Sequence, residues 1–172
     1  MRKFLFLTLL LPGAAFAAGS DTTSAPSTPK CEDGFVYDSG TDSCVQSSSS
    51  LIDEGERIEA LREYAHAGDA AAARVVLSSF ADQTADAVLT YRGFLARKAG
   101  DMQAAMGWYE TALAANPDNL LARSYMGQGL VTVGDFVGAK RQYDEIVARG
   151  GKGSWAEIAL VEAITTGTTY SY

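Results

Sequence analysis

The chain has 172 residues, 47% of them hydrophobic and 20% charged, which is enough apolar material for a folded domain. Its formal net charge at pH 7 is −7, and its basic residues form no continuous run. This balance argues against nucleic acid or an anionic membrane as the main partner.

The first residues predict a cleaved secretory signal peptide over 1–17. Arg2 and Lys3 precede an apolar run, and Ala15-Phe16-Ala17 provides the small residues of a cleavage site. A membrane anchor is the competing interpretation, but Pro12-Gly13 interrupt the run and it is short for a bilayer. Cleavage would leave 12 basic against 21 acidic residues, a net charge of −9. We therefore expect an exported protein, in the periplasm rather than secreted further, without an integral membrane segment in its mature form.

A small disulfide-closed hairpin is predicted over 31–45, between a disordered linker at 18–30 and a second linker at 46–50. The first linker is rich in Ser, Thr, Pro and Gly, which cannot bury a core. Cys31 and Cys44 are the only cysteines, so an exported chain allows one intramolecular pairing, and closing this loop contributes about 3 kcal/mol. Two short β-prone runs flank a turn-forming segment at 38–42. The hairpin could dock a partner or cap the following domain.

From Leu51 to residue 166 the apolar residues recur with helical spacing. We expect seven helices, at 51–66, 69–82, 86–99, 102–115, 119–133, 136–149 and 154–166. A Gly-Asp pair recurs between helices with spacings of 32 and 34 residues, at Gly68-Asp69, Gly100-Asp101 and Gly134-Asp135. Glycine can end one helix in the left-handed conformation and aspartate can cap the next, so each pair predicts a turn.

These residues resemble the tetratricopeptide repeat (TPR), a 34-residue helix-turn-helix unit, over about two-thirds of the chain. The best-matching unit, 86–119, has Leu89, Gly93, Ala105, Tyr109, Ala112 and Pro117 at motif positions. The next unit, 120–151, has Gly127, Ala139, Tyr143 and Ile146, and the unit at 54–85 is degenerate. The resemblance implies an all-α, TPR-like helical-hairpin solenoid over 51–166, with about three repeats and a capping helix.

Two details of packing are expected from this register. Gly93 and Gly127 each cost about 1 kcal/mol inside a helix, which close approach of a neighbour would justify, with Tyr109 or Tyr143 opposite. The capping helix is expected to bury Ile158, Leu160, Val161 and Ile164. Its Trp155 would either pack at the cap junction or bind a ligand.

In this family the first helix of each unit lines a concave peptide-binding groove. The resemblance implies groove positions at Arg62, Tyr91, Phe94, Arg97, Lys98, Tyr125 and Gln128, with His66, Thr90, Ser124 and Val131 nearby. The asparagines with which some relatives grip a terminal carboxylate are missing. The cations, with Arg123, could attract an acidic or carboxylate-ended peptide. In the competing interpretation, Arg97 and Lys98 are solvated cations that favour a helix C-terminus.

The sequence predicts no enzyme. It has no P-loop, GxGxxG or HExxH motif, and no nucleophile or carboxylate pair accompanies His66. We expect no catalytic residue, cofactor or metal site. The predicted function is a periplasmic, non-catalytic adaptor or scaffold that binds a peptide or protein partner. The alternative is a structural envelope-assembly protein acting by self-association or docking, through the hairpin or the aromatic tail at 167–172.

Overall fold

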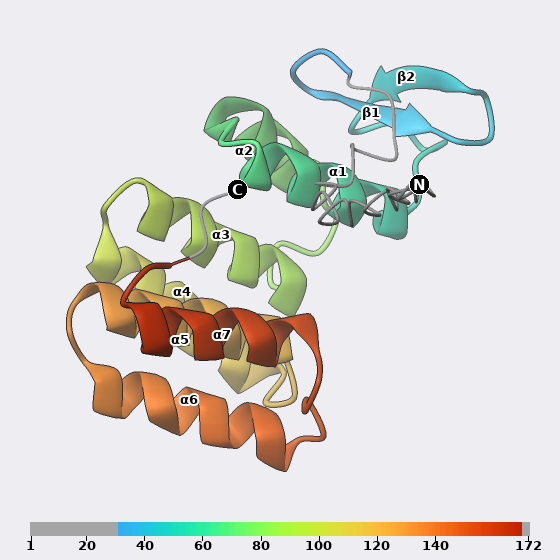
Figure 1. The fold of residues 1–172 in the computed structure, drawn as a ribbon. Coiled ribbons are helices and arrows are strands. Elements are labelled where there is room, and N and C mark those ends of the chain that lie inside the picture. The colour runs from blue at the N-terminus through green and yellow to red at the C-terminus, as the bar shows by residue number, and fades with distance from the viewer. Residues whose placement is uncertain (1–30, 170–172) are drawn as a thin grey trace, which may run out of the picture.

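The computed structural model describes residues 31–169, which form a helical solenoid preceded by a two-stranded antiparallel hairpin (Figure 1). The predicted signal peptide, the linker up to residue 30 and residues 170–172 of the tail lie outside the described residues. Within that part of the chain there are two strands and seven helices, and the expected all-α class is confirmed. The elements are β1 (Phe35–Asp38), β2 (Ser43–Gln46), α1 (Glu54–His66), α2 (Ala70–Ser78), α3 (Asp86–Lys98), α4 (Met102–Ala115), α5 (Leu120–Thr132), α6 (Phe136–Ala148) and α7 (Trp155–Thr166).

The three Gly-Asp pairs are turns with one shared geometry. Gly68, Gly100 and Gly134 have φ of 78°, 84° and 82°, a conformation that glycine adopts without a Cβ clash. The aspartate that follows each glycine donates its backbone N–H to the carbonyl of the residue five positions earlier. Its side chain accepts the backbone N–H of the residue three positions later. The predicted helix stop and helix start are confirmed at all three pairs.

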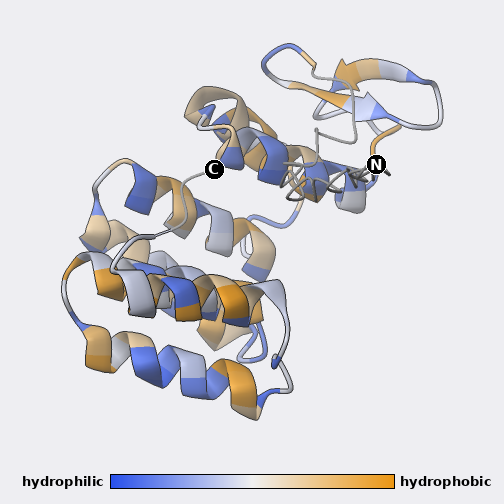
Figure 2. Ribbon diagram, in the orientation of Figure 1, coloured by the Kyte–Doolittle hydropathy of each residue, from blue (hydrophilic) through white to orange (hydrophobic). Residues whose placement is uncertain are grey.

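Helices pack in consecutive antiparallel pairs, α1 with α2, α3 with α4 and α5 with α6, and α7 then covers α5 and α6. The first helices of successive pairs also touch, because α3 contacts both α1 and α5, and α5 contacts α7. Hydrophobic and hydrophilic segments alternate along these helices (Figure 2). None of the helices in residues 31–169 is long and apolar enough to cross a membrane.

The two mid-helix glycines meet different partners. A Cβ at Gly93 would lie 2.5 Å from the Tyr109 ring, so this expected close approach is confirmed. A Cβ at Gly127 would instead lie 2.6 Å from Cδ1 of Leu160 in α7. The expectation of Tyr143 opposite Gly127 is therefore wrong, because α7 supplies the side chain that fills this space.

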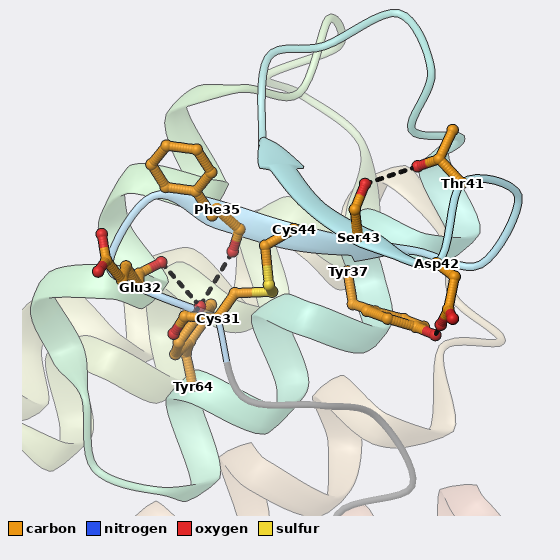
Figure 3. The surroundings of a disulfide bond; sticks show 9 residues. All are labelled: Cys31, Glu32, Phe35, Tyr37, Thr41, Asp42, Ser43, Cys44 and Tyr64. Atoms are coloured by element: carbon orange, nitrogen blue, oxygen red, sulfur yellow. Dashed lines mark hydrogen bonds between the residues drawn. A yellow bond between two sulfur atoms is a disulfide. The ribbon is translucent and has the colours of Figure 1, made fainter.

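The hairpin is attached firmly to α1 (Figure 3). The predicted disulfide joins Cys31 and Cys44, with a Cα–Cα distance of 5.7 Å. The Tyr64 hydroxyl donates toward the carbonyls of Cys31, Glu32 and Phe35, at 3.2, 3.2 and 2.9 Å. Val36 is 1% exposed and belongs to the same hydrophobic cluster as α1. The hairpin thus covers the α1 end of the solenoid.

Residues 46–50, between the hairpin and α1, also lie against the first helix. Arg57 donates from Nε to the Ser47 carbonyl and from Nη2 to the Ser49 carbonyl, both at 2.8 Å. Ser47 is itself buried. One α1 side chain therefore binds two backbone carbonyls of this segment.

The last helix buries a smaller face than the sequence suggested. Its buried residues are Leu160 and three alanines, Ala156, Ala159 and Ala163, spaced along one side of the helix. Ile158 and Val161 are 55% and 41% exposed, so the expectation that they face the core is wrong. Alanines let the α7 backbone approach α5 closely, which rotates the larger β-branched residues outward.

Candidate functional site

A groove with a volume of about 680 Å³ lies on the face formed by the first helices of the pairs. Its walls come from α1, α3, α5 and α7 and from the turn before α5. The lining residues are Ile58, Arg62, His66, Asp86, Ala87, Thr90, Tyr91, Asn116, Asn119, Leu120, Leu121, Tyr125 and Trp155. Four elements separated along the sequence therefore contribute to one concave surface.

Aromatic rings form the floor of this groove. Phe94 and Tyr125 lie 4.8 Å apart by ring centroids, and the His66 ring is 5.5 Å from Phe94. Trp155 stacks on His66 at 6.5 Å and meets Tyr125 edge-on at 5.9 Å. Tyr91 contacts both Phe94 and Tyr125. Trp155 is the most exposed of these aromatic side chains, at 37%.

His66 links the first and third helix pairs across the floor. Its Nε2 atom is 2.8 Å from the Tyr125 hydroxyl, at hydrogen-bonding distance. Burial, together with the smaller effect of the positive charges of Arg62 and Lys98, lowers the pKa of His66 to about 4. The imidazole is consequently neutral at pH 7 and acts here as a hydrogen-bonding ring.

Arg97 is a buried cation beneath the floor. It is 7% exposed, and its guanidinium carbon lies 5.5 Å from the Phe94 ring centre and 6.0 Å from that of Tyr125. Such contacts offset part of the cost of burying a charge. Its Nε and Nη2 atoms have no hydrogen-bond partner among residues 31–169. Burial raises the pKa of the nearby Tyr109 hydroxyl to about 12, while the Arg97 charge acts in the opposite direction.

The start of α3 supplies a different chemistry. Asp86 accepts hydrogen bonds at Oδ2 from the side-chain amides of Asn116 and Asn119, at 2.7 and 2.8 Å. The Asn119 amide also lies 3.1 Å from the Thr90 hydroxyl. No cation pairs with Asp86 in the described part of the chain. This end of the groove therefore combines a carboxylate with fixed amides.

The structure separates the seven sequence-derived groove residues into four groups. Arg62, Tyr91 and Tyr125 line the groove, and Phe94 and Arg97 lie beneath them. Lys98 is exposed at the end of α3, close enough to influence His66. Gln128 is fully buried and donates to the Ser124 hydroxyl at 3.3 Å, away from the lining.

Arg123 faces away from the groove. It donates from Nε and Nη2 to the carbonyl of Pro117 and lies 3.7 Å from the Glu145 carboxylate. Its position on α5 therefore reinforces the turn before that helix and the contact with α6. Of the four cations, only Arg62 lines the groove, whereas Arg97 is buried beneath it and Lys98 is exposed at the end of α3.

Sequence reasoning missed Asp86, Asn116 and Asn119 as groove residues. Asn119 also caps α5, because its side-chain oxygen accepts the N–H of Ala122. Its side-chain amide nitrogen donates to Asp86 in the preceding helix pair. The helix-start position was the available signal, since the starts of α3, α5 and α7 all line the groove.

No family model, curated protein or solved structure matches this chain in comparisons with known proteins. The groove and the repeat pattern are therefore the features of this chain that indicate a function.

Proposed function

We propose that this chain is an exported, non-catalytic adaptor of the TPR type that holds a peptide segment of a partner in the groove. The observation that carries the proposal is the 680 Å³ groove with its ring floor and its exposed Trp155 edge. The volume falls in the range of about 300–1,000 Å³ typical of ligand pockets. Tryptophan at the edge of a buried aromatic cluster is a frequent anchor in protein recognition.

The groove's chemistry favours binding over catalysis. His66 is neutral and hydrogen-bonded to Tyr125, and the hydroxyl, amide and carboxylate groups at the α3 end bond one another. The described residues contain no cluster of three or more potential metal ligands. Rings, amides and separated charges suit recognition of an extended chain.

Export is part of the proposal. The Cys31–Cys44 disulfide is compatible with an oxidising compartment. Residues 1–17 have the composition of a cleaved signal, and the periplasm is the proposed location. Intact-mass measurement of the protein from its native cells tests both points. A mass that retains residues 1–17, or free thiols at both cysteines, would count against export.

Peptide display tests the binding function directly. A random peptide library is selected on the purified, disulfide-bonded protein, and affinities of the enriched peptides are measured by fluorescence anisotropy. We expect Trp155→Ala to weaken binding by about tenfold or more, since an anchor ring is removed.

Phe136→Ala is the matched control, because Phe136 is an exposed aromatic residue on α6, outside the groove lining. It should leave the affinity unchanged. An absence of enriched peptides, or an equal loss with both variants, would refute the groove as the binding site.

A further inference from the structure

We infer that the groove selects a segment that carries a primary ammonium group, such as a lysine side chain, and that this group pairs with Asp86 at the start of α3. The inference rests on the proposed peptide-binding function and specifies the substrate class of the same groove. It is carried by the charges of the groove lining and by the hydrogen bonds that hold the Asp86 carboxylate.

The charges of the groove lining leave one carboxylate uncompensated. Among the described residues, the charged side chains of the lining are Arg62 and Asp86, and Arg62 is already paired with Glu59. Asp86 has no cationic partner within residues 31–169. His66 also lines the groove, but its pKa of about 4 makes it neutral at pH 7. A ligand that brings a positive charge therefore complements this groove, on a chain whose net charge is −7.

Two asparagine side chains hold the Asp86 carboxylate in place. Nδ2 of Asn116 and Nδ2 of Asn119 donate to its Oδ2 atom, at 2.7 and 2.8 Å. The oxygen of each asparagine side chain accepts a backbone N–H, from Asp118 at 3.0 Å and from Ala122 at 2.8 Å. These backbone bonds fix the orientation of each amide, so its nitrogen faces Asp86. The carboxylate is thus oriented before a ligand binds, which lowers the cost of ordering it.

The second oxygen of the carboxylate is open. Oδ1 of Asp86 accepts no hydrogen bond from the described residues. Asp86 is partly exposed and lines the groove, which places it within reach of a bound segment. A lysine ammonium suits this position, because it is a compact charge that needs one acceptor oxygen. An arginine fork engages both oxygens of a carboxylate, and here the two amides already occupy Oδ2.

Apolar side chains of the same groove suit the rest of such a segment. Ile58, Leu120 and Leu121 are partly buried and line the groove, and Trp155 is 37% exposed. The carbon stem of a lysine packs on surfaces of this kind while its ammonium reaches a polar group. The inferred ligand is therefore basic and apolar, in contrast to the acidic peptide considered from the sequence.

Peptide selection on two forms of the protein tests the inference. A random peptide library is selected on the native protein and on Asp86→Asn, and lysine should be enriched on the native protein alone. In a selected peptide, replacing that lysine by glutamine should weaken binding to the native protein about fivefold at low salt. The difference should shrink at high salt and should be absent in Asp86→Asn.

Glu110→Gln is the matched control. Glu110 is an exposed carboxylate on α4, outside the groove lining, and its replacement changes the net charge by the same amount. This variant should keep the full preference for lysine.

Two peptide arms identify the source of the ammonium group. An acetylated peptide with lysine carries the group on a side chain alone, and an unacetylated peptide with glutamine carries it at the amino terminus alone. A gain in affinity that depends on Asp86 in either arm supports the inference and assigns the source.

The measurements also separate ligand contact from a structural role of Asp86, which ties α3 to the turn before α5. A structural effect of Asp86→Asn would weaken the lysine and glutamine peptides alike, so the preference would persist. The native protein gives an independent measurement by NMR, because the side-chain amides of Asn116 and Asn119 donate to Asp86. The lysine peptide should shift their resonances more than the glutamine peptide does.

The outcomes distinguish the inference from the function beneath it. Equal affinity of the native protein for the charged and neutral peptides, or a preference that persists in Asp86→Asn, would overturn the inference and leave peptide binding standing. If the native protein enriches no peptide at all, the proposed function fails with it.

Discussion

The second and third helix pairs carry the same motif 34 residues apart, yet they close their cores differently. Gly93 and Tyr109 in the α3/α4 pair correspond to Gly127 and Tyr143 in the α5/α6 pair. Tyr109 is fully buried against Gly93, whereas Tyr143 is only partly buried and lies beneath the Lys140 ammonium at 5.8 Å.

The third pair fills the equivalent space with other side chains. Leu160 of α7 covers Gly127, and Ile146 stands where the second pair has Ala112. Both Leu160 and Ile146 are fully buried. Two copies of one motif in the same chain thus fill equivalent core positions with different side chains.

Alanine at the two equivalent tyrosines gives the largest expected difference between the pairs. Tyr109→Ala should lower the free energy of unfolding by about 4 kcal/mol, because it leaves a large cavity beside Gly93. Tyr143→Ala should cost about 1 kcal/mol, because that ring is partly in solvent. Urea unfolding followed by circular dichroism measures both. Equal losses would show that the two tyrosines have the same role.

Alanine substitutions at the two equivalent glycines test the same difference by adding a methyl group to each core. A methyl at residue 93 meets the rigid Tyr109 ring, and we expect Gly93→Ala to destabilise the protein by about 2 kcal/mol. A methyl at residue 127 meets the flexible end of Leu160, and the better helix propensity of alanine offsets part of the strain. Gly127→Ala should therefore cost less than about 1 kcal/mol. A larger loss at residue 127 in the same unfolding assay would contradict this ranking.

The pH dependence of stability tests the surroundings of His66, which contacts Tyr125 and so links the first and third helix pairs. The pKa of His66 is lowered to about 4 in the folded protein, below its ordinary value of 6.5. The unfolded chain therefore binds the proton first as the pH falls, and stability is lost between about pH 6.5 and pH 4.

His66→Gln removes this titration while other groups remain. The stability advantage of the native protein over the variant should shrink by about 1–2 kcal/mol between pH 7 and pH 4.5, after allowance for the partial exposure of the ring. Parallel unfolding curves at each pH supply the comparison. A constant difference across this range would mean that His66 is not held neutral by its surroundings.

The Gly-Asp turns should behave alike in the two pairs, with the smallest effect. Asp101 accepts the N–H of Ala104 at 3.0 Å, and Asp135 accepts that of Gly138 at 2.7 Å. Asp101→Ala and Asp135→Ala should each cost about 1 kcal/mol, the usual loss for an N-cap. Thermal unfolding of the two variants checks this, and a marked inequality would indicate that one turn has a further role.

Much of the local structure could be predicted from the sequence. Helix ends fell within a few residues of their observed positions, because glycine, aspartate and proline act on their immediate neighbours. The resemblance to the tetratricopeptide repeat implied which helices line one face. The groove was only partly predictable, because Trp155 and Asn119 acquire their neighbours from helices 30 or more residues away.

Local sequence signals were sufficient to predict the turns, the Cys31–Cys44 pairing and the order of the helix pairs. Each depends on short-range hydrogen bonds, on backbone conformations that glycine permits, or on there being two cysteines. Only the tertiary structure decided that alanines rather than Ile158 and Val161 bury α7, that Leu160 covers Gly127, and that His66 meets Tyr125. Those contacts depend on the relative rotation and spacing of helices, which side-chain volumes from several units set together.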